Sequence, residues 1–407
     1  MLTVSERGRK LPASPIRKLA PFADAAKAHG VKVYHLNIGQ PDIPTPEVGL
    51  AALKTIDRTT LEYSPSDGYP EVREKFAEYY AKKGISVTPD QIIITAGGSE
   101  ALNFALLSCL DPGDEVIMTE PCYANYISFG QEAGVNVVSI PTSIENGFAL
   151  PPIAEIEKYI TPRTRALLIC NPNNPTGYIY DRAEMEHLGE IVRRHNLFLI
   201  SDEVYREFAY TDTPPVSVLS IPGIEQNVVM VDSVSKRYSE CGIRVGMLVT
   251  RNKEVRTAAM KAAQARLSPP LLGQIVAAAS VDAPDSYLEA IYDEYISRRD
   301  LLIEGLNRIP GVFAPMPRGA FYTMARLPVD DADKFCEWIL SEFTHTPAGS
   351  AVPSTVMMAP GSGFYTDPSR GRDEVRIAYV LKKSDIAAAL EILAAALQAY
   401  PGRPSGR

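Results

Sequence analysis

The stretch that decides the fold reads Ser233-Val234-Ser235-Lys236-Arg237-Tyr238-Ser239-Glu240-Cys241-Gly242-Ile243-Arg244-Val245-Gly246. It follows an apolar run, residues 228–232, that predicts a buried strand. A lysine in a loop is most often a solvated surface charge. Here, however, Lys236 lies at a strand end, where α/β sheets bind ligands, between small hydroxyl residues and with Arg244 eight positions on. Hydroxyls and an arginine beside an amine indicate an anion pocket, which suits a phosphorylated carbonyl cofactor bound to the lysine as a Schiff base.

Similar runs before this stretch set the fold class. Between residues 90 and 250, short β-branched runs alternate with helical patterns, and several runs are apolar throughout. Continuous apolarity indicates burial on both faces, which is typical of a mostly parallel sheet flanked by helices. We therefore predict a large α/β domain. The predicted strands are residues 92–95, 115–119, 136–140, 166–170, 197–201 and 228–232, and the predicted helices among them are 99–110 and 124–133.

The last hundred residues predict a smaller α+β domain. Segment 310–326 reads as strands joined by Pro- and Gly-rich turns, and it is followed by a helix at 332–342, strands at 356–359 and 375–378, and a helix at 384–399. The polar, Gly-rich loop 361–373 is expected to be exposed. We assign residues 46–300 to the large cofactor-binding domain and 301–407 to the small one. Residues 1–45 form an arm that packs on the small domain or on a partner subunit.

The composition is that of an ordinary globular chain and excludes several kinds of partner. Of 407 residues, 41 are basic and 49 acidic, so the net charge is −8. An acid excess argues against nucleic acid as a partner, because phosphate binding needs clustered positive charge. No apolar run has the roughly 18–20 residues of a membrane span. The N-terminus also lacks the apolar core of a signal peptide, so we expect a cytoplasmic protein.

Cysteine and histidine form no pattern typical of a disulfide framework or a metal site. The five cysteines are odd in number and contain no Cys-x-x-Cys pair. The five histidines lack the spacing of metal ligands. We therefore expect free thiols and no bound metal.

The chain resembles the class I and II aminotransferases, which are fold-type-I enzymes of pyridoxal 5′-phosphate. The segment around Lys236 is similar to the cofactor-lysine motif of that family, and eight further markers stand in the family's order along nearly the whole chain. These markers are Asn37-Ile38-Gly39-Gln40-Pro41-Asp42, Tyr63 with Gly68 and Arg73, Gly97-Gly98-Ser99-Glu100-Ala101-Leu102, Pro121-Cys122-Tyr123, Asn171-Pro172-Asn173-Asn174-Pro175-Thr176-Gly177, Ser201-Asp202-Glu203-Val204-Tyr205, Gly319-Ala320-Phe321-Tyr322 and Val375-Arg376-Ile377-Ala378-Tyr379. Each marker alone is weak, but together they leave little room for chance. A nicotinamide enzyme would instead show Gly-x-Gly-x-x-Gly after its first strand.

The resemblance implies three catalytic residues. Lys236 would bind the cofactor and, once freed by substrate, move a proton as general base and acid. Asp202 would pair with the protonated pyridine nitrogen and keep the ring an electron sink; taken alone, an aspartate at this point also fits a helix cap or a turn. Tyr205, together with Asn174, would donate to the phenolic oxygen of the cofactor.

The resemblance also implies a phosphate site and a stacking residue. Helix N-termini offer free N–H groups to an anion, and arginine can bind two oxygens at once. Tyr123 would stack on the pyridine face, where the best-known aspartate enzymes have tryptophan. The residues implied at the phosphate are Gly98, Ser99, Ser233, Ser235, Arg244 and, reaching over from a neighbouring subunit of a homodimer, Tyr63.

The substrates implied by the resemblance are L-amino acids and 2-oxo acids, exchanged in a ping-pong cycle. Arg376 would bind the α-carboxylate in a charge-assisted pair, with Gly39 and Asn174 beside it. We predict glutamate with 2-oxoglutarate as one pair and aspartate as its partner, which needs a second cation. Arg17 and Arg266 are the candidates for this cation, and the alternative for each is a surface or interface ion pair.

Other functions stay open at this point. An aromatic or aliphatic amino-acid aminotransferase would need no second cation. Carbon–sulfur β-lyases share these motifs and would release pyruvate and ammonia from a cysteine conjugate. The same fold also serves as the ligand-sensing domain of some transcription regulators, but those proteins carry an added DNA-binding module. Here the fold accounts for nearly all of an acidic chain, which argues against that role.

Overall fold

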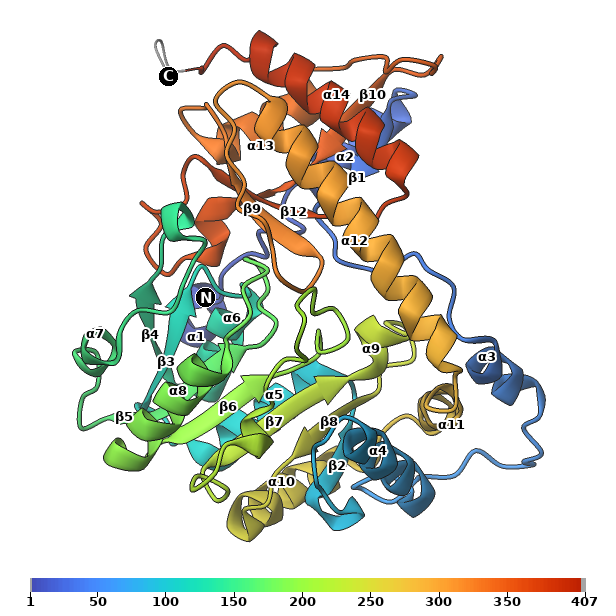
Figure 1. The fold of residues 1–407 in the computed structure, drawn as a ribbon, viewed down its shortest axis with the longest axis vertical. Coiled ribbons are helices and arrows are strands. Elements are labelled where there is room, and N and C mark those ends of the chain that lie inside the picture. Colours follow the sequence, from blue (N-terminus) through green and yellow to red (C-terminus); the bar gives the residue numbers. More distant parts are fainter. Residues whose placement is uncertain (1, 404–407) are drawn as a thin grey trace.

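The computed structural model describes residues 2–403, and a seven-stranded sheet lies at the centre of its broader part (Figure 1). The strand order is β2 (Ile92–Thr95), β8 (Gly246–Val249), β7 (Val228–Ser233), β6 (Phe198–Asp202), β5 (Thr164–Cys170), β3 (Glu115–Glu120) and β4 (Asn136–Pro141). The strands from β7 to β4 are parallel, whereas β8 runs antiparallel to both of its neighbours. The predicted α/β class with a mostly parallel sheet is confirmed.

Alternate residues of each strand pack into two separate hydrophobic clusters. In β2, Ile93 belongs to one cluster, and Ile92 and Ile94 belong to the other. The first cluster is covered by α5 (Gly98–Cys109), α6 (Asn125–Ala133) and α10 (Lys253–Arg266), and the second by α4 (Pro70–Lys82), α8 (Arg182–His195) and α11 (Leu271–Ser280). Burial on both faces is the reason that these strands read as continuous apolar runs.

The N-terminal arm and the C-terminal residues together build the narrower part (Figure 1). In the arm, β1 (Lys32–His35) pairs in parallel with β10 (Ser354–Met357), and α2 (Ala20–Ala28) packs against α13 (Ala332–Ser341). The strands β11 (Ala359–Pro360), β12 (Glu374–Ala378) and β9 (Tyr322–Arg326) form an antiparallel sheet, and α14 (Lys383–Ala399) ends the chain's secondary structure. Within the arm, β1 and α2 therefore pack against the C-terminal part of the same chain, whereas α1 (Glu6–Lys10) lies against α6 of the broad part (Figure 1).

The long helix α12 (Asp285–Arg308) runs from the broad part to the narrow part, where it packs against α14. Residue 300, the proposed domain boundary, lies inside this helix, and the division into domains stays a prediction. None of the helices between residues 2 and 403 is both long and apolar enough to cross a membrane. The remaining elements are α3 (Glu47–Lys54), α7 (Ile153–Glu157), α9 (Val234–Arg237) and the 3-10 turns η1 (Pro89–Gln91), η2 (Ile144–Asn146), η3 (Val218–Ser220) and η4 (Gly361–Phe364).

The structure corrects two expectations about the C-terminal part. The loop 361–373 is not exposed throughout, because Phe364 at the end of η4 is buried against Ala124 and Ala359. Segment 310–326 holds one strand, β9, together with two isolated bridges, one between Phe313 and Arg326 and one between Gly319 and Ala209. The proline and glycine turns in this segment leave too few consecutive residues for a second strand.

Gly246, the first residue of β8, lies against the turn between β2 and α5. A Cβ at Gly246 would lie 2.4 Å from the carbonyl carbon of Gly97 and 2.6 Å from the amide nitrogen of Gly98. We predict that Gly246→Ala displaces this turn and lowers the free energy of unfolding by about 1–3 kcal/mol, as overpacking does elsewhere. Denaturant unfolding alongside Gly242→Ala tests this, because a Cβ at Gly242 meets no atom within 4 Å. Equal stability of the two variants would contradict the close approach.

Candidate active site

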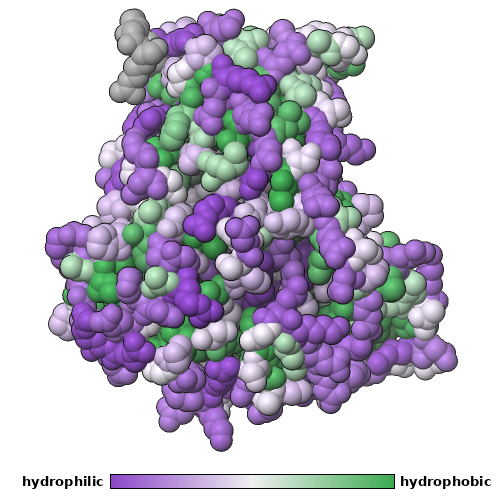
Figure 2. Space-filling view, viewed as in Figure 1, coloured by the Kyte–Doolittle hydropathy of each residue, from purple (hydrophilic) through white to green (hydrophobic). Residues whose placement is uncertain are grey.

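The carboxyl ends of β6 and β7 border a cavity of about 540 Å³, which residues of both the broad and the narrow part line. On the face drawn in Figure 2, the surface is hollowed where the two parts meet, and hydrophilic residues surround this hollow. Thirteen of the predicted site residues line the cavity: Arg17, Gly39, Gly98, Ser99, Tyr123, Asn174, Asp202, Tyr205, Ser233, Ser235, Lys236, Arg244 and Arg376. Tyr63 and Arg266 are absent from its lining.

One end of the cavity carries the donors that an anion needs. Helix α5 begins at Gly98, so its free N–H groups face the cavity together with Ser99. The hydroxyls of Ser233 and Ser235 lie 2.9 Å apart at the start of α9. Arg244 donates to the carbonyls of Cys241 at 3.0 Å and Ala96 at 3.4 Å and forms no ion pair with residues 2–403. This donor set suits a phosphate group.

The middle of the cavity holds an amine and a buried carboxylate. The Nζ of Lys236 donates to the carbonyl of Gly39 at 2.8 Å. Asp202, which ends β6, accepts from the hydroxyl of Tyr126 at 2.8 Å and from the N–H of Val204 at 3.3 Å. Burial raises the pKa of Asp202 to about 6, and the Tyr126 hydrogen bond partly opposes this rise. A buried carboxylate without an ion pair is suited to stabilise a cation.

Asn174 connects the middle of the cavity to its far end. Its Nδ2 donates to the hydroxyl of Tyr205 at 3.3 Å, and its Oδ1 accepts from Nη1 of Arg376 at 3.1 Å. The hydroxyl of Tyr205 also lies 3.1 Å from that of Tyr322. The segment 171–177 therefore links the residues predicted to bind the cofactor to the one predicted to bind the substrate.

Among residues 2–403, Arg376 is a buried cation without a carboxylate partner. It is 1% exposed, donates to the carbonyl of Asn37, and lies between the rings of Tyr322 and Phe364, with centroids 4.6 and 4.9 Å from its guanidinium carbon. Burial lowers the pKa of Arg376 below its ordinary value. Its Nε has no hydrogen-bond partner among residues 2–403. A carboxylate bound in the cavity would offer the acceptor that this guanidinium lacks.

Two predicted residues border the cavity on the side of the arm. Tyr123 is half-buried, and its hydroxyl accepts from Nδ2 of Asn125 at 2.9 Å. Burial raises the pKa of Tyr123 to about 12. Arg17 is exposed and forms no ion pair within the described chain. Its charge is therefore available to a ligand in the cavity.

The structure does not bring Tyr63 or Arg266 to this cavity. Tyr63 is 77% exposed, and its predicted role in a neighbouring subunit stays a prediction. Arg266 pairs with Glu100 at 3.2 Å and donates to the carbonyls of Ser66 at 2.9 Å and Ile94 at 3.3 Å. These contacts correspond to the ion-pair alternative for Arg266.

Sequence reasoning missed two tyrosines that take part in the site. Tyr126 donates to Asp202, and Tyr322 contacts both Tyr205 and Arg376. Tyr126 lies in the first turn of α6, three residues after Tyr123, and the two rings contact each other with centroids 5.3 Å apart. No group of three or more His, Cys, Asp or Glu side chains suited to a metal ion occurs within the described residues.

The sequence matches the family aminotransferase class I and II over residues 31–393. The chain belongs to this family. It is 32% identical over 403 residues to the aspartate/prephenate aminotransferase of Thermus thermophilus, with 96% of this chain and 99% of the relative covered. It is 34% identical over 367 residues to the aspartate aminotransferase of Thermotoga maritima, with 89% and 92% covered. The protein is therefore an aminotransferase, and the family predicted from its motifs is confirmed.

Solved structures agree with this aminotransferase fold. The aspartate aminotransferase from Thermus thermophilus with maleate matches with a TM-score of 0.87 and 31% identity, over 97% of this chain and 100% of that one. The alanine aminotransferase from Pyrococcus furiosus matches with a TM-score of 0.87 and 30% identity, over 98% and 100%. The neighbours thus share the fold but carry different substrate names.

Burial of Asp202 lowers the stability of this aminotransferase at high pH. In the folded chain, burial raises the pKa of the Asp202 carboxyl to about 6. The carboxyl therefore loses its proton as the pH rises past 6, and the buried negative charge then lowers the free energy of unfolding. We predict that Asp202→Asn, which keeps an acceptor for Tyr126, stabilises the ligand-free protein by about 1 kcal/mol more at pH 8 than at pH 5. Denaturant unfolding at both pH values measures this, with the exposed Asp212→Asn as control. A gain independent of pH would contradict the role of burial.

Proposed function

We propose that this aminotransferase binds pyridoxal 5′-phosphate through Lys236 and transfers the amino group of an L-amino acid to a 2-oxo acid. We propose glutamate and 2-oxoglutarate as one pair, with aspartate as partner. The observation that carries the proposal is that one cavity gathers an anion site, an amine, a buried carboxylate and a buried guanidinium without a carboxylate partner. A cytoplasmic location, without membrane or nucleic-acid partners, stays a prediction.

The residues in the cavity fit the parts of this cofactor. Asp202 would hold a cationic ring nitrogen, because its carboxylate is buried without an ion pair. Tyr205 and Asn174, 3.3 Å apart, would donate to the phenolic oxygen. Tyr123 would lie on the ring face. The residues that would bind the phosphate are Gly98, Ser99, Ser233, Ser235, Arg244 and, from a second subunit, Tyr63. When bound, the cofactor supplies an electron sink for the negative charge that develops at the substrate Cα.

The chain's own residues account for binding and proton transfer. Arg376 would bind the α-carboxylate, and its contact with Asn174 ties the position of that carboxylate to the cofactor end of the cavity. Lys236 is the amine of the cavity that can take the proton from the substrate Cα and return it. Its contact with the Gly39 carbonyl, at 2.8 Å, would hold the amine on the same side as the bound carboxylate.

Arg17 is the residue that we propose to read a second carboxylate. Arg266 forms an ion pair with Glu100, whereas Arg17 lines the cavity and forms no ion pair with residues 2–403. Two relatives are named for aspartate, which carries such a carboxylate. A neighbour named for alanine, which does not, keeps aliphatic or aromatic substrates as the alternative.

We further propose a homodimer. Exposed apolar side chains gather on α3 and α11, which pack against each other. These side chains are Val48, Leu50, Leu53 and Leu272, and Leu61 and Tyr63 follow α3 along the chain. A surface of this kind is typical of an interface between subunits. Pairing across it would supply the second subunit from which Tyr63 acts.

Lys236→Ala tests the proposed mechanism. We predict that steady-state transamination falls by about 10²–10⁴-fold, because the variant lacks its general base. Borohydride should no longer fix the cofactor to the protein, which mass spectrometry of the intact chain measures. The exposed Lys261→Ala serves as control and should keep both properties. Retention of more than about a hundredth of the turnover would remove Lys236 from the proton-transfer role.

Arg17→Ala tests the proposed substrate. We predict that kcat/KM for aspartate and glutamate falls about tenfold or more, because a charge pair with the second carboxylate is lost, while alanine is unaffected. The matched control is Lys18→Ala, whose ammonium is already paired with Asp333. Arg266→Ala should show no selectivity for dicarboxylates. An equal loss for alanine, or no loss at all, would favour aromatic or aliphatic substrates.

A further inference from the structure

Four charged side chains form a buried network beneath the cavity without lining it. Glu203, Arg206, Asp232 and Arg237 are 2%, 7%, 0% and 1% exposed, and their formal charges cancel. Each of the four is the sequence neighbour of a residue that we propose to contact the cofactor. The adjoining residues, in the same order, are Asp202, Tyr205, Ser233 and Lys236.

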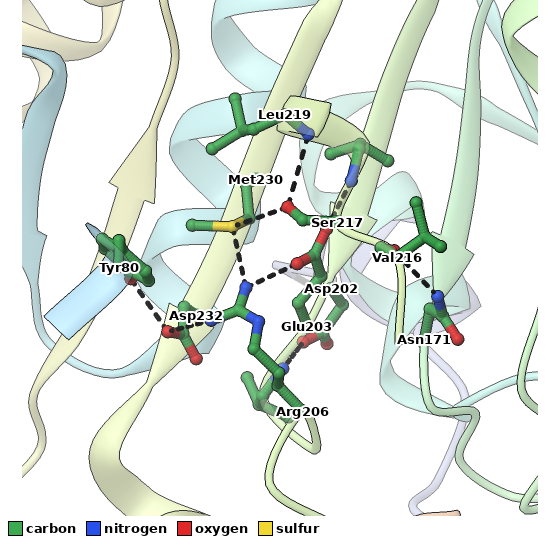
Figure 3. Close-up of polar contacts among 12 residues, drawn as sticks. Tyr80, Asn171, Asp202, Glu203, Arg206, Val216, Ser217, Leu219, Met230 and Asp232 are labelled. Carbon is green, nitrogen blue, oxygen red and sulfur yellow. Dashed lines mark hydrogen bonds and ion pairs between the residues drawn. The ribbon is translucent and has the colours of Figure 1, made fainter. Parts of the chain in front are cut away.

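Asp232 is the centre of this network. Its Oδ1 contacts Nη2 of Arg237 and accepts from the N–H of Ser233 at 2.7 Å. Its Oδ2 accepts from the hydroxyl of Tyr80 at 2.8 Å and from Nη1 of Arg206 at 3.4 Å (Figure 3). Because side chains alternate along a strand, Asp232 points away from the cavity while Ser233 points toward it.

The second half of the network fixes the segment after β6. Nη2 of Arg206 contacts Glu203, which also accepts from the hydroxyl of Ser217 at 3.1 Å and the N–H of Val218 at 2.9 Å (Figure 3). Arg206 therefore lies between Glu203 and Asp232. This arrangement joins the ends of two neighbouring strands, β6 and β7.

The Asp232–Arg237 pair closes the short segment that carries Lys236. The two side chains stand at either end of Ser233-Val234-Ser235-Lys236, and Nη2 of Arg237 also donates to the carbonyl of Ser233 at 3.3 Å. The guanidinium carbon lies 4.4 Å from the ring centroid of Tyr79. Helix α9 has only four residues, and a helix this short needs outside contacts to keep its form.

Stability alone does not explain a buried pair of this kind. Taking charges out of water offsets much of their attraction, so apolar residues of similar size often serve stability as well. In addition, Nε and Nη1 of Arg237 have no hydrogen-bond partner among residues 2–403. The burial of this pair is therefore weak evidence that it serves stability.

We propose that Asp232 and Arg237 are positioning residues for the cofactor. Their ion pair holds Lys236 and the hydroxyls of Ser233 and Ser235 toward the cavity from the opposite face of the sheet. Arg206 and Glu203 extend the same support to Asp202 and Tyr205. This inference rests on the proposed function, because it concerns how well the chain binds pyridoxal 5′-phosphate.

A double-mutant cycle on cofactor binding tests the proposal. The full-length proteins are the wild type, Asp232→Asn, Arg237→Gln and the double variant. Each is depleted of cofactor and titrated with pyridoxal 5′-phosphate by absorbance, and borohydride fixation at Lys236 is timed by peptide mass spectrometry. The control is Arg163→Gln, which breaks an ion pair with Glu115 at the amino end of the sheet. Melting temperatures of the cofactor-free proteins are measured in parallel.

We expect each single variant to raise the Kd for the cofactor about tenfold, and the double variant to bind no worse than the weaker single. Borohydride fixation at Lys236 should be slower in each variant that has a higher Kd. The control Arg163→Gln should match the wild type in both Kd and fixation rate. Unchanged Kd values with only a lowered melting temperature, or Kd effects of the two substitutions that multiply in the double variant, would reduce the pair to a structural role and overturn the proposal.

Arg237→Lys keeps the test decisive if Arg237→Gln does not fold. It retains the charge beside Asp232 but loses the planar fork that also contacts Ser233 and Tyr79. Because the charge beside Asp232 is retained, we expect this variant to bind the cofactor more tightly than Asp232→Asn does, and binding as weak as that of Asp232→Asn would overturn the proposal. If the wild type itself neither binds the cofactor nor is fixed at Lys236, the proposed function fails instead.

Discussion

Burial of the central sheet on both faces is the constraint on which the rest of the molecule depends. A strand covered on both sides can hold polar groups only where they find hydrogen bonds, since an unpaired buried polar group is costly. Polar side chains therefore gather where β6 and β7 end. Neighbouring side chains there point to opposite faces of the sheet, and the two faces have different roles. Asp202 and Ser233 face the cavity, whereas Glu203 and Asp232 face the helices beneath and pair with arginines.

The sequence predicts the parts of the fold in which local pattern and tertiary burial agree. Each strand from β2 to β7 contains a run of apolar residues, and these runs predict where the strands lie. In contrast, β1 and β8 are not among the predicted strands, and each pairs with a strand from a distant part of the chain, β10 and β2 respectively. The burial of Phe364 could not be predicted from the sequence for a similar reason, because it depends on Ala124, which lies 240 residues earlier.

The candidate site likewise has features that the sequence predicts and features that depend on contacts between distant residues. Lys236, Asp202 and Arg376 stand in motifs that the resemblance carries, and all of them line one cavity. The motifs do not show whether each charged side chain is paired with an opposite charge. Arg17 and Arg266 are equivalent candidates in the sequence, and the structure separates them, because Arg17 lines the cavity whereas Arg266 lies outside it and pairs with Glu100. Tyr126 likewise acts through a contact with Asp202 that spans 76 residues of chain.

Helix α12 gives the molecule a mechanical property. Its 24 residues make a rod about 36 Å long, and an unbroken helix resists bending. The rod begins after Pro284, beside the broad part, and carries the narrow part at its other end. Given this length, a tilt of about 3° at its start would move the far end by about 2 Å. Arg376 and Gly39 line the cavity from the narrow part, so a tilt of this one helix would change the width of the cavity.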